Sequence, residues 1–218
     1  MNLKNKRVLI TAGPTWVTID KVRVISNTAT GKTGILLAEK LQDLGAKVTL
    51  ALGPVESCCL NKEIRLIRFK FFEDLRKIIG TELKSKRYNI LIHSAAVSDY
   101  RPARKYNLKV GSGLKQWKVN LVPTIKIIDL IRDSDASLYL VGFKFEPQAK
   151  DSFLLAQARN LLLRVNANLV VANTIDKKNN YRAYILSPDR RYGPILSRQG
   201  LAGKLTKIIG EDVCSSLN

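Results

Sequence analysis

Near the start of the chain lies the run Arg7-Val8-Leu9-Ile10-Thr11-Ala12-Gly13-Pro14, from which we predict the centre of the fold. Aliphatic and β-branched residues fill its first part, and Gly13-Pro14 ends it sharply. A short apolar run bounded by turn residues is typical of a strand buried on both faces, as in a parallel sheet. We therefore predict a central strand over residues 7–12, followed by a tight turn.

Helical patterns alternate with strand patterns along the rest of the chain. The first helix is predicted from Gly31 to Leu44, where apolar residues recur at helical spacing, and Gly45 is expected to stop it. Further strands are predicted at 47–52, 64–69, 89–97, 116–121, 138–143 and 169–172, and further helices at 73–86, 123–132, 150–165 and 197–210. Two more strands, 182–186 and 192–196, are expected to form a hairpin.

This order of elements predicts an α/β fold: a doubly wound, mainly parallel Rossmann-like sheet with helices on both faces, plus a C-terminal β-hairpin region. Residues 1–218 fit a single domain, because no linker, repeat or low-complexity tract divides them. Ligands of such sheets bind at the carboxyl ends of the strands. The loops expected at those ends, 13–32, 94–109 and 142–146, are therefore the candidate binding loops.

Composition excludes several classes of protein. Hydrophobic residues make up 45% of the chain and charged residues 25%, which are globular proportions. No apolar run reaches the roughly 20 residues of a membrane span, and the segment before the first strand lacks the apolar stretch of a secretory signal. Cys58, Cys59 and Cys214 lack the spacing of a zinc site. We interpret them as reduced thiols and expect a cytoplasmic protein without a membrane partner.

The charge balance is strongly basic, with 37 Lys and Arg against 18 Asp and Glu and a formal net charge of +19. Such an excess fits a nucleic-acid-binding protein, a solvated basic surface, or an enzyme with polyanionic substrates. The basic residues are scattered in small groups, and no basic helix, zinc finger or RNA-binding motif accompanies them. Nucleic-acid binding is therefore kept as the weaker alternative.

The first candidate segment runs from Ile25 to Gly34 and places hydroxyl residues and glycines just before a helix. Free backbone N–H groups and the helix dipole at such a point suit a phosphate. Ser26 stands where a Walker A loop requires glycine, so an ordinary ATPase loop is rejected. The alternative is a helix that is merely capped by a threonine.

The second segment, Ala95 to Pro102, ends a buried strand with small residues that let a flat ligand approach the backbone. Asp99 is able to accept hydrogen bonds from a sugar or base, or to help hold a metal, and Arg101 suits a phosphate. The alternative is a turn closed by an Asp–Arg salt bridge.

Two further segments carry candidate ligand contacts. Lys109 lies beside the Gly-Ser-Gly run 111–113, which suggests a mobile lid over phosphates; the alternative is an exposed flexible loop. Phe143, at a strand end, is placed to stack on a base or simply to pack in the core. His93 is interpreted as a core residue, which leaves a serine or cysteine hydrolase without a base.

A nicotinamide-dependent dehydrogenase is the obvious competitor on this fold. The first turn, however, has no G-x-G-x-x-G, and the second strand ends in Leu52-Gly53-Pro54, without the acidic residue that holds a ribose. Both features weigh against it.

The segments, in order, resemble the phosphopantothenate–cysteine ligase family. Leu9 to Thr15 resembles its opening strand and turn. The run Ile19-Asp20-Lys21-Val22-Arg23, with Ile25-Ser26-Asn27 and Thr30-Gly31-Lys32, resembles its signature D-x-V-R…I-S-N-x-S-S/T-G-K-x-G. Ala95 to Pro102 resembles A-A-V-A/S-D-Y/F-R/x-P, and 142–146 and 170–173 resemble two later landmarks. The matches span about residues 7 to 174.

The resemblance implies an enzyme that joins cysteine to 4'-phosphopantothenate in coenzyme A biosynthesis. It implies an acyl-nucleotide intermediate made from a nucleoside triphosphate, with CTP preferred over ATP, Mg²⁺ on the triphosphate, and release of pyrophosphate and CMP or AMP. It also implies a homodimer, with the region after Asn173 as a candidate interface.

The resemblance also implies the site residues. Asn27 and Lys109 are the expected catalytic residues, and the Asn27 amide is expected to bond the acyl carbonyl or acyl phosphate. The expected nucleotide- and phosphate-binding residues are Gly13, Ser26, Thr30, Gly31, Gly34, Ala95, Ala96, Asp99, Pro123, Thr124, Ile125 and Phe143.

The sequence departs from the family pattern at three places. Asn107 stands where the lid usually has its first lysine, so Lys109 or Lys105 is expected to take its role. Leu161 and Val165 replace two lysines of CTP-using members, and Lys144 resembles members outside the fused bacterial type. These departures leave ATP open, and also an inactive family member that acts as a partner protein.

Overall fold

The computed structural model describes residues 3–56, 60–85 and 88–215. Its centre is an eight-stranded sheet with the order β12-β11-β10-β9-β6-β1-β4-β5. The neighbours from β10 to β5 are parallel, and β11 and β12 add an antiparallel hairpin at one edge. The strands are β1 (Arg7–Ala12), β4 (Lys47–Leu52), β5 (Arg65–Arg68), β6 (Ile90–His93), β9 (Tyr139–Phe145), β10 (Leu169–Ile175), β11 (Tyr181–Leu186) and β12 (Arg191–Ile195).

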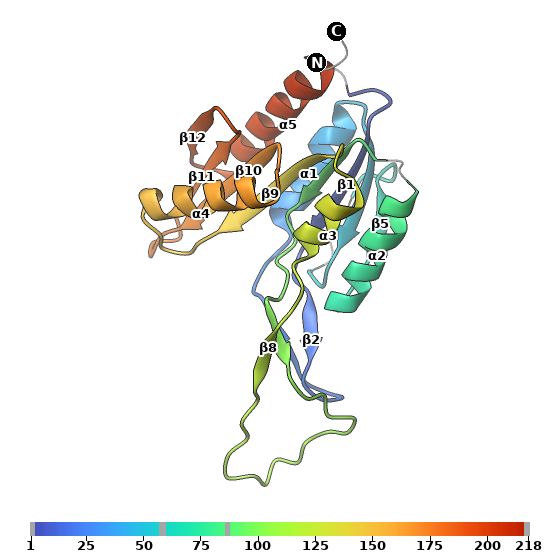
Figure 1. Cartoon of the computed structure of the whole chain (residues 1–218), viewed down its shortest axis with the longest axis vertical. Helices are drawn as coiled ribbons and strands as arrows, with labels where there is room; N and C mark the ends of the chain where they lie inside the picture. The colour runs from blue at the N-terminus through green and yellow to red at the C-terminus, as the bar shows by residue number, and fades with distance from the viewer. Residues whose placement is uncertain (1–2, 57–59, 86–87, 216–218) are drawn as a thin grey trace.

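Helices cover both faces of this sheet (Figure 1). Helices α1 (Lys32–Asp43) and α5 (Arg198–Ser215) pack on one face. Helices α2 (Phe72–Lys84), α3 (Ile127–Ser134) and α4 (Asp151–Arg164) pack on the other. The predicted doubly wound sheet with a C-terminal hairpin is therefore confirmed. None of the helices in the described ranges is long and apolar enough to cross a membrane.

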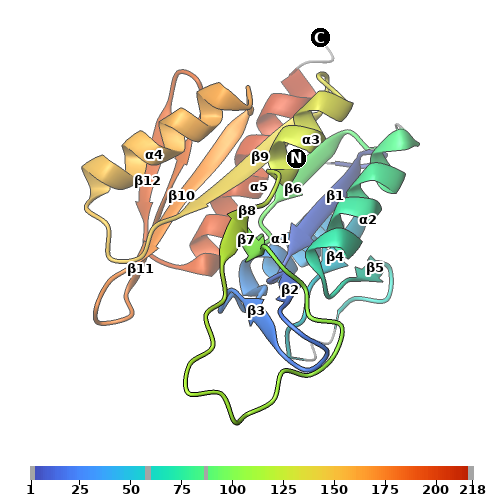
Figure 2. The same cartoon turned by 60° about the horizontal axis from the view of Figure 1, so that its bottom comes forward.

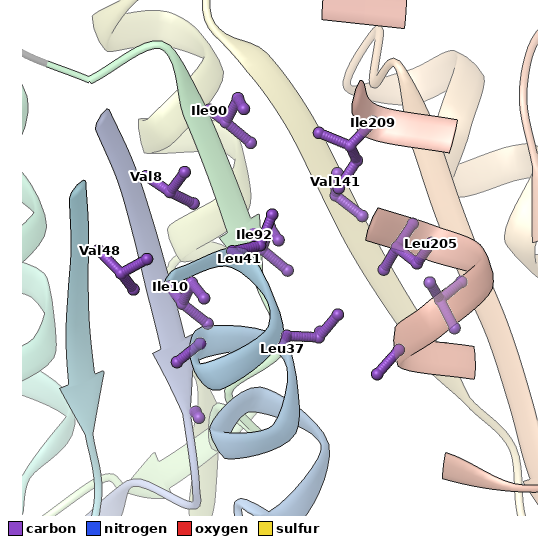
Figure 3. Packing of buried hydrophobic residues seen from close by; sticks show 14 of the residues in the cluster. Val8, Ile10, Leu37, Leu41, Val48, Ile90, Ile92, Val141, Leu205 and Ile209 are labelled. Atoms are coloured by element: carbon purple, nitrogen blue, oxygen red, sulfur yellow. The ribbon is translucent and has the colours of Figure 1, made fainter. Parts of the chain in front are cut away.

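The core between the sheet and α1 and α5 is built from alternate strand residues. Figure 3 shows Ile10 of β1 and Ile92 of β6 on the side of the sheet that α1 covers, and Val141 of β9 beside Leu205 and Ile209 of α5. The continuous apolar run of β1 serves both faces, since Leu9 belongs to the opposite core. This burial on both faces is why strand 7–12 was readable from sequence alone.

The two ends of α1 differ from each other in how they are closed. Gly45 stops the helix as predicted, with N–H bonds from Gly45 to Gln42 at 2.8 Å and from Ala46 to Leu41 at 3.0 Å. At the start, Gly31 is the N-cap with φ of 69°, and no side chain caps the helix. The threonine-capped alternative is therefore wrong.

A narrow arm projects from the carboxyl edge of the sheet (Figures 1 and 2). We call residues 15–26 and 100–123 the arm. It contains the hairpin β2 (Trp16–Thr18) and β3 (Val24–Ser26), and the ladder β7 (Tyr100–Pro102) and β8 (Leu121–Pro123). The loop 103–120 between β7 and β8 forms its far end.

The arm corrects two expectations from the sequence. Residues 116–120 form no strand, because the β7–β8 ladder is only three residues long and the chain then leaves it to close the loop. Pro123 does not begin a helix either, because it pairs with Tyr100 and the next N–H, of Thr124, donates to the Asp99 carbonyl at 2.9 Å. Helix α3 begins only at Ile127.

The strand predicted at 89–97 is also shorter than expected and ends at His93. Beyond Ser94 the backbone pairs with the turn after β1 instead of continuing in the sheet. The N–H of Ala96 donates to the Gly13 carbonyl at 2.9 Å, and that of Thr15 donates to the Ala96 carbonyl at 3.2 Å. The small residues Ala95 and Ala96 therefore lie in a segment that has left the sheet.

Gly34, the third residue of α1, allows that helix to approach β1 closely. A Cβ at this position would lie 2.3 Å from the Ala12 Cβ and 2.9 Å from the Ser94 Oγ. We expect Gly34→Ala to lower the free energy of unfolding by about 1–3 kcal/mol, because the helix must move away from the strand. Urea denaturation measures this change.

Gly80→Ala is the matched control, because Gly80 is inside helix α2 and a Cβ there would meet nothing within 4 Å. It should raise stability by about 0.5–1 kcal/mol through helix propensity alone. Equal effects at the two positions would contradict the close-packing account.

Candidate active site

The predicted phosphate loop lies at the carboxyl ends of β1 and β6, at the base of the arm. Gly13 follows β1 and Gly31 precedes α1, and a Cβ on Gly31 would come within 3.5 Å of the Gly13 nitrogen. Both glycines have positive φ, 80° and 69°, which residues with a side chain rarely adopt. The backbone at the start of α1 is therefore close to the first turn, and its N–H groups carry the positive end of the helix dipole.

Asn27 joins the two signature segments. It follows β3 directly, and its side-chain amide donates to the carbonyls of Ala96, at 3.0 Å, and Val97, at 3.2 Å. An amide has two N–H groups, so both are engaged here. The predicted donation from Asn27 to a substrate therefore requires one of these two bonds to be given up.

A second set of bonds fixes the segment after β6 against the arm. The Ser98 N–H donates to the Thr15 Oγ1 at 2.9 Å, and the Ser98 hydroxyl donates to the Thr15 carbonyl at 3.1 Å. The Thr124 hydroxyl donates to the Ser98 carbonyl at 2.7 Å. Ser98 is buried within this group, so the position of the next residue, Asp99, is closely defined.

The Asp99 carboxylate is exposed and forms an ion pair with Lys126, at 2.5 Å. This pair replaces the alternative of an Asp99–Arg101 salt bridge. Nothing in the sequence pattern had pointed to Lys126, which lies just past the predicted segment Pro123-Thr124-Ile125. A cation held against the predicted nucleotide-binding carboxylate is well placed to meet an incoming phosphate as well.

The remaining predicted residues lie around the same edge. Phe143 is near the end of β9, one residue past Gly142, which pairs with His93 of β6. It is partly buried and packs against the core below α1 and α5. Exposed residues of the predicted set are Ser26, Thr30, Pro123 and Ile125, while Ala95 and Ala96 are partly buried.

Lys109 is the predicted residue that the structure keeps apart from this group. It lies in the loop 103–120, together with Asn107 and Lys105, and this loop forms the far end of the arm (Figure 2). Its neighbour Val110 bonds to Asp20 in the turn between β2 and β3. Its predicted contact with a triphosphate at the base of the arm therefore requires the loop to fold back.

His93 is a core residue, as predicted. It is 8% exposed, and its Nδ1 shares a hydrogen bond of 2.8 Å with the Thr11 hydroxyl. Burial lowers the pKa of His93 to about 4, so the imidazole is neutral at pH 7. Of the cysteines, Cys214 is exposed, and Cys58 and Cys59 lie outside the described residues.

A hollow of about 510 Å³ lies at the opposite edge of the sheet, between the starts of β1, β4 and β5. None of the predicted site residues lines it. Two of its lining side chains bond to the buried Glu82: Arg65 donates to the Glu82 carboxylate at 2.8 and 3.1 Å, and the Tyr88 hydroxyl donates to the same carboxylate. We regard this hollow as a structural feature rather than the reaction site, because ligands of this fold bind at the carboxyl ends of the strands.

The residues present fit a metal that arrives with a substrate. In the described part of the chain, no group of three His, Cys, Asp or Glu side chains is arranged to hold an ion. Asp99 is the exposed carboxylate at the predicted site. Mg²⁺ commonly takes one or two protein carboxylates and completes its shell with phosphates and water.

Comparisons with known proteins identify relatives along nearly the whole chain. The chain is 35% identical over 209 residues to a coenzyme A biosynthesis bifunctional protein CoaBC from Thermococcus kodakarensis. The matched region covers 94% of this chain and 51% of that protein. The chain thus spans about half the length of this relative.

Two solved structures share the fold. A DNA/pantothenate metabolism flavoprotein from Streptococcus pneumoniae has a TM-score of 0.84 and 25% identity, over 94% of this chain and 99% of that chain. The C-terminal domain of a coenzyme A biosynthesis bifunctional protein CoaBC has a TM-score of 0.80 and 26% identity, over 97% of each chain.

The matching family model is described as the DNA/pantothenate metabolism flavoprotein C-terminal domain, and it covers residues 3–210. Because that range includes the whole sheet and arm, helices α1 to α4, and α5 as far as residue 210, the chain belongs to this family.

Proposed function

We propose that this chain is a ligase that joins cysteine to 4'-phosphopantothenate through an acyl-nucleotide intermediate. One observation carries the proposal: the amide of Asn27 bonds the carbonyls of Ala96 and Val97 at the carboxyl edge of the parallel strands. The two most specific segments of the sequence, about 70 residues apart, thereby meet at one edge of the sheet, which supports a common site there. The relatives that are named as coenzyme A biosynthesis proteins support the same pathway.

The reaction begins with activation of a carboxylate. A carboxylate oxygen of 4'-phosphopantothenate attacks the α-phosphorus of the triphosphate, and the bond to the β-phosphate oxygen breaks to release pyrophosphate. The cysteine amine then attacks the acyl carbon, loses a proton and expels the nucleoside monophosphate. A free carboxylate is inert toward amines, so the nucleotide supplies the leaving group.

The protein's part is to position the reactants and stabilise charge. The N-terminus of α1, capped by Gly31 without a side-chain bond, offers backbone N–H groups to a phosphate. Asp99 and Lys126 present opposite charges beside the Thr124 hydroxyl. Asn27 offers an amide to the developing charge by exchanging one of its two carbonyl bonds.

Mg²⁺ would be held by the triphosphate with Asp99 as the protein ligand, and would neutralise phosphate charge. The base is proposed to lie near Phe143 and the segment from Pro123 to Ile125, and CTP is the proposed triphosphate. The active form is proposed to be a homodimer, with the region after Asn173 at its interface.

We expect Asn27→Asp to lower kcat for amide formation by about 10²–10³, the usual cost of losing one preorganised donor. The fold should survive, because Asn27 is exposed. Amide formation is measured with phosphopantothenate, cysteine and each triphosphate, beside the thermal melting curve. Near-normal turnover in a folded variant would remove Asn27 from the mechanism.

Asn89→Asp is the control for the same change in charge at the opposite edge. The Oδ1 of exposed Asn89 accepts the Arg7 N–H at 2.9 Å, an acceptor that aspartate keeps. Its turnover should match that of the parent.

The preferred triphosphate is tested by thermal shift with CTP, ATP, GTP and UTP, each with Mg²⁺. A ligand that binds only the native state raises its stability in proportion to the logarithm of its concentration over Kd. CTP should give the largest shift at equal concentration. A shift with ATP alone would reverse the assignment.

The proposal that the loop 103–120 closes over the triphosphate as a lid is tested by Lys105→Ala, Lys109→Ala and Asn107→Lys. Lys109→Ala should raise the KM for triphosphate more than it changes stability, since exposed Lys109 adds nothing to the core. Asn107→Lys should keep or increase the specificity constant by adding a positive charge to the loop. If both alanine variants match the parent and Asn107→Lys changes nothing, the loop is not a phosphate lid.

A further inference from the structure

Asp20 is a buried carboxylate in an arm that is otherwise largely exposed. Its side chain is fully buried, in the turn between β2 and β3. One oxygen accepts the N–H groups of Val22, at 2.9 Å, and Arg23, at 2.8 Å. The other accepts the Arg23 guanidinium at 2.5 Å and the N–H of Val110 at 3.1 Å. Val110 lies 90 residues further along the chain, in the loop at the end of the arm.

These donors keep Asp20 ionised. Burial acts to raise its pKa, but the backbone bonds from Val22, Val110 and Arg23 and the Arg23 side chain outweigh it and lower the pKa to about 2. A carboxyl whose pKa falls on folding stabilises the native state above its ordinary pKa, and this contribution is lost as pH falls toward 2. The contact is therefore intact throughout the neutral range.

Arg23 extends the contact into the loop. Its guanidinium donates to the Val110 carbonyl at 3.2 Å and lies 5.0 Å from the ring centre of Trp117. Trp117 meets Tyr106 edge to face, with centroids 5.7 Å apart, and the Tyr106 N–H donates to the Ile19 carbonyl at 3.1 Å. Three points of the loop, at 106, 110 and 117, are thus held to one turn.

We propose that Asp20 is a positioning residue for Lys109: its carboxylate fixes the backbone at Val110, and through it the direction from which Lys109 reaches the triphosphate. This inference rests on the proposed function, in which Lys109 contacts phosphate. The β2–β3 turn and the loop 103–120 then move as one unit, since the bonds of Tyr106 and Val110 end on residues 19–23.

Limited proteolysis tests the anchoring without reference to activity. Trypsin sites in the loop are Arg104, Lys105, Lys109, Lys115 and Lys118. In Asp20→Asn the loss of charge weakens the bond to Val110, and cleavage in the loop should be at least about tenfold faster, because cleavage follows the population of the open form. Mass spectrometry assigns the cut sites.

Asp176→Asn is the matched control. Asp176 also accepts two backbone N–H groups, of Lys178 at 2.8 Å and Asn180 at 2.9 Å, but within its own turn. It should leave cleavage of the loop unchanged. Val110→Pro is the second variant: it deletes the N–H that donates to Asp20 and leaves the β2–β3 turn intact, so it should open the loop even if Asp20→Asn fails to fold. Because trypsin does not cut before proline, cleavage of this variant is followed at Arg104, Lys105, Lys115 and Lys118.

A double-mutant cycle tests the link to Lys109. Asp20→Asn should weaken binding of CTP with Mg²⁺, measured as Kd by thermal-shift titration, by about as much as Lys109→Ala. In the Lys109→Ala background, Asp20→Asn should have no further effect on that Kd, whereas a purely structural role gives independent, additive effects. For this cycle Val110→Pro replaces Asp20→Asn if the latter does not fold.

Unchanged trypsin cleavage of the loop in both Asp20→Asn and Val110→Pro overturns the proposal. Additive effects of Asp20→Asn and Lys109→Ala on the Kd for CTP overturn it as well. A parent protein that binds CTP but forms no amide overturns the proposed ligase function instead, and leaves the role of Asp20 standing if the cycle shows coupling.

Discussion

The site depends on one set of bonds, those between the turn after β1 and the segment after β6. Two adjacent parallel strands end at the same edge, and the backbone groups beyond them no longer have sheet partners. Here the N–H of Ala96 donates to the Gly13 carbonyl at 2.9 Å and that of Thr15 donates to the Ala96 carbonyl at 3.2 Å, while the N–H of Ser98 donates to the Thr15 hydroxyl at 2.9 Å. Buried backbone groups need hydrogen-bond partners. The segments after β1 and after β6 therefore leave the sheet together, and the arm begins there.

The pairing also limits which side chains the site can hold. Gly34 brings α1 against the end of β1, and a Cβ on Gly53 would lie 2.2 Å from the Pro14 carbonyl oxygen. Little room remains for side chains at these two positions, so main-chain groups come close together there. Such an arrangement suits phosphates and a carboxylate, which are bound by N–H donors rather than by apolar walls.

The sequence predicted the main sheet well and the arm poorly, for a physical reason. The central strands are long, apolar and buried on both faces, so their pattern is strong, whereas β2, β3, β7 and β8 have three residues each and show no readable period. The β7 and β8 strands are joined by a long loop that carries no turn signal for a short hairpin. Pairing set by such distant neighbours cannot be read from a local window.

The same distinction applies to the site. Asn27, Asp99 and Thr124 were predicted from segments that resemble family signatures, and bonds through Ala96, Val97 and Ser98 connect all three. Lys126 was missed, because its only signal is the ion pair with Asp99, which the fold creates. Asp20 lay inside a quoted signature, but its bond to Val110 joins residues too far apart for any spacing argument.

Part of the chain's positive charge is located in the arm. Asp20 is the only acidic residue in the arm's sequence, which contains eight lysines and arginines. Those cations repel one another, and the buried Asp20 carboxylate offsets one of them directly through Arg23. On the proposed function, a triphosphate and a phosphorylated acid both approach the base of this arm. A concentrated positive field attracts such anions over about one Debye length, near 8 Å at physiological salt. On that proposal, the charge of the substrates accounts for the cations of the arm, which are eight of the 37 lysines and arginines in the chain.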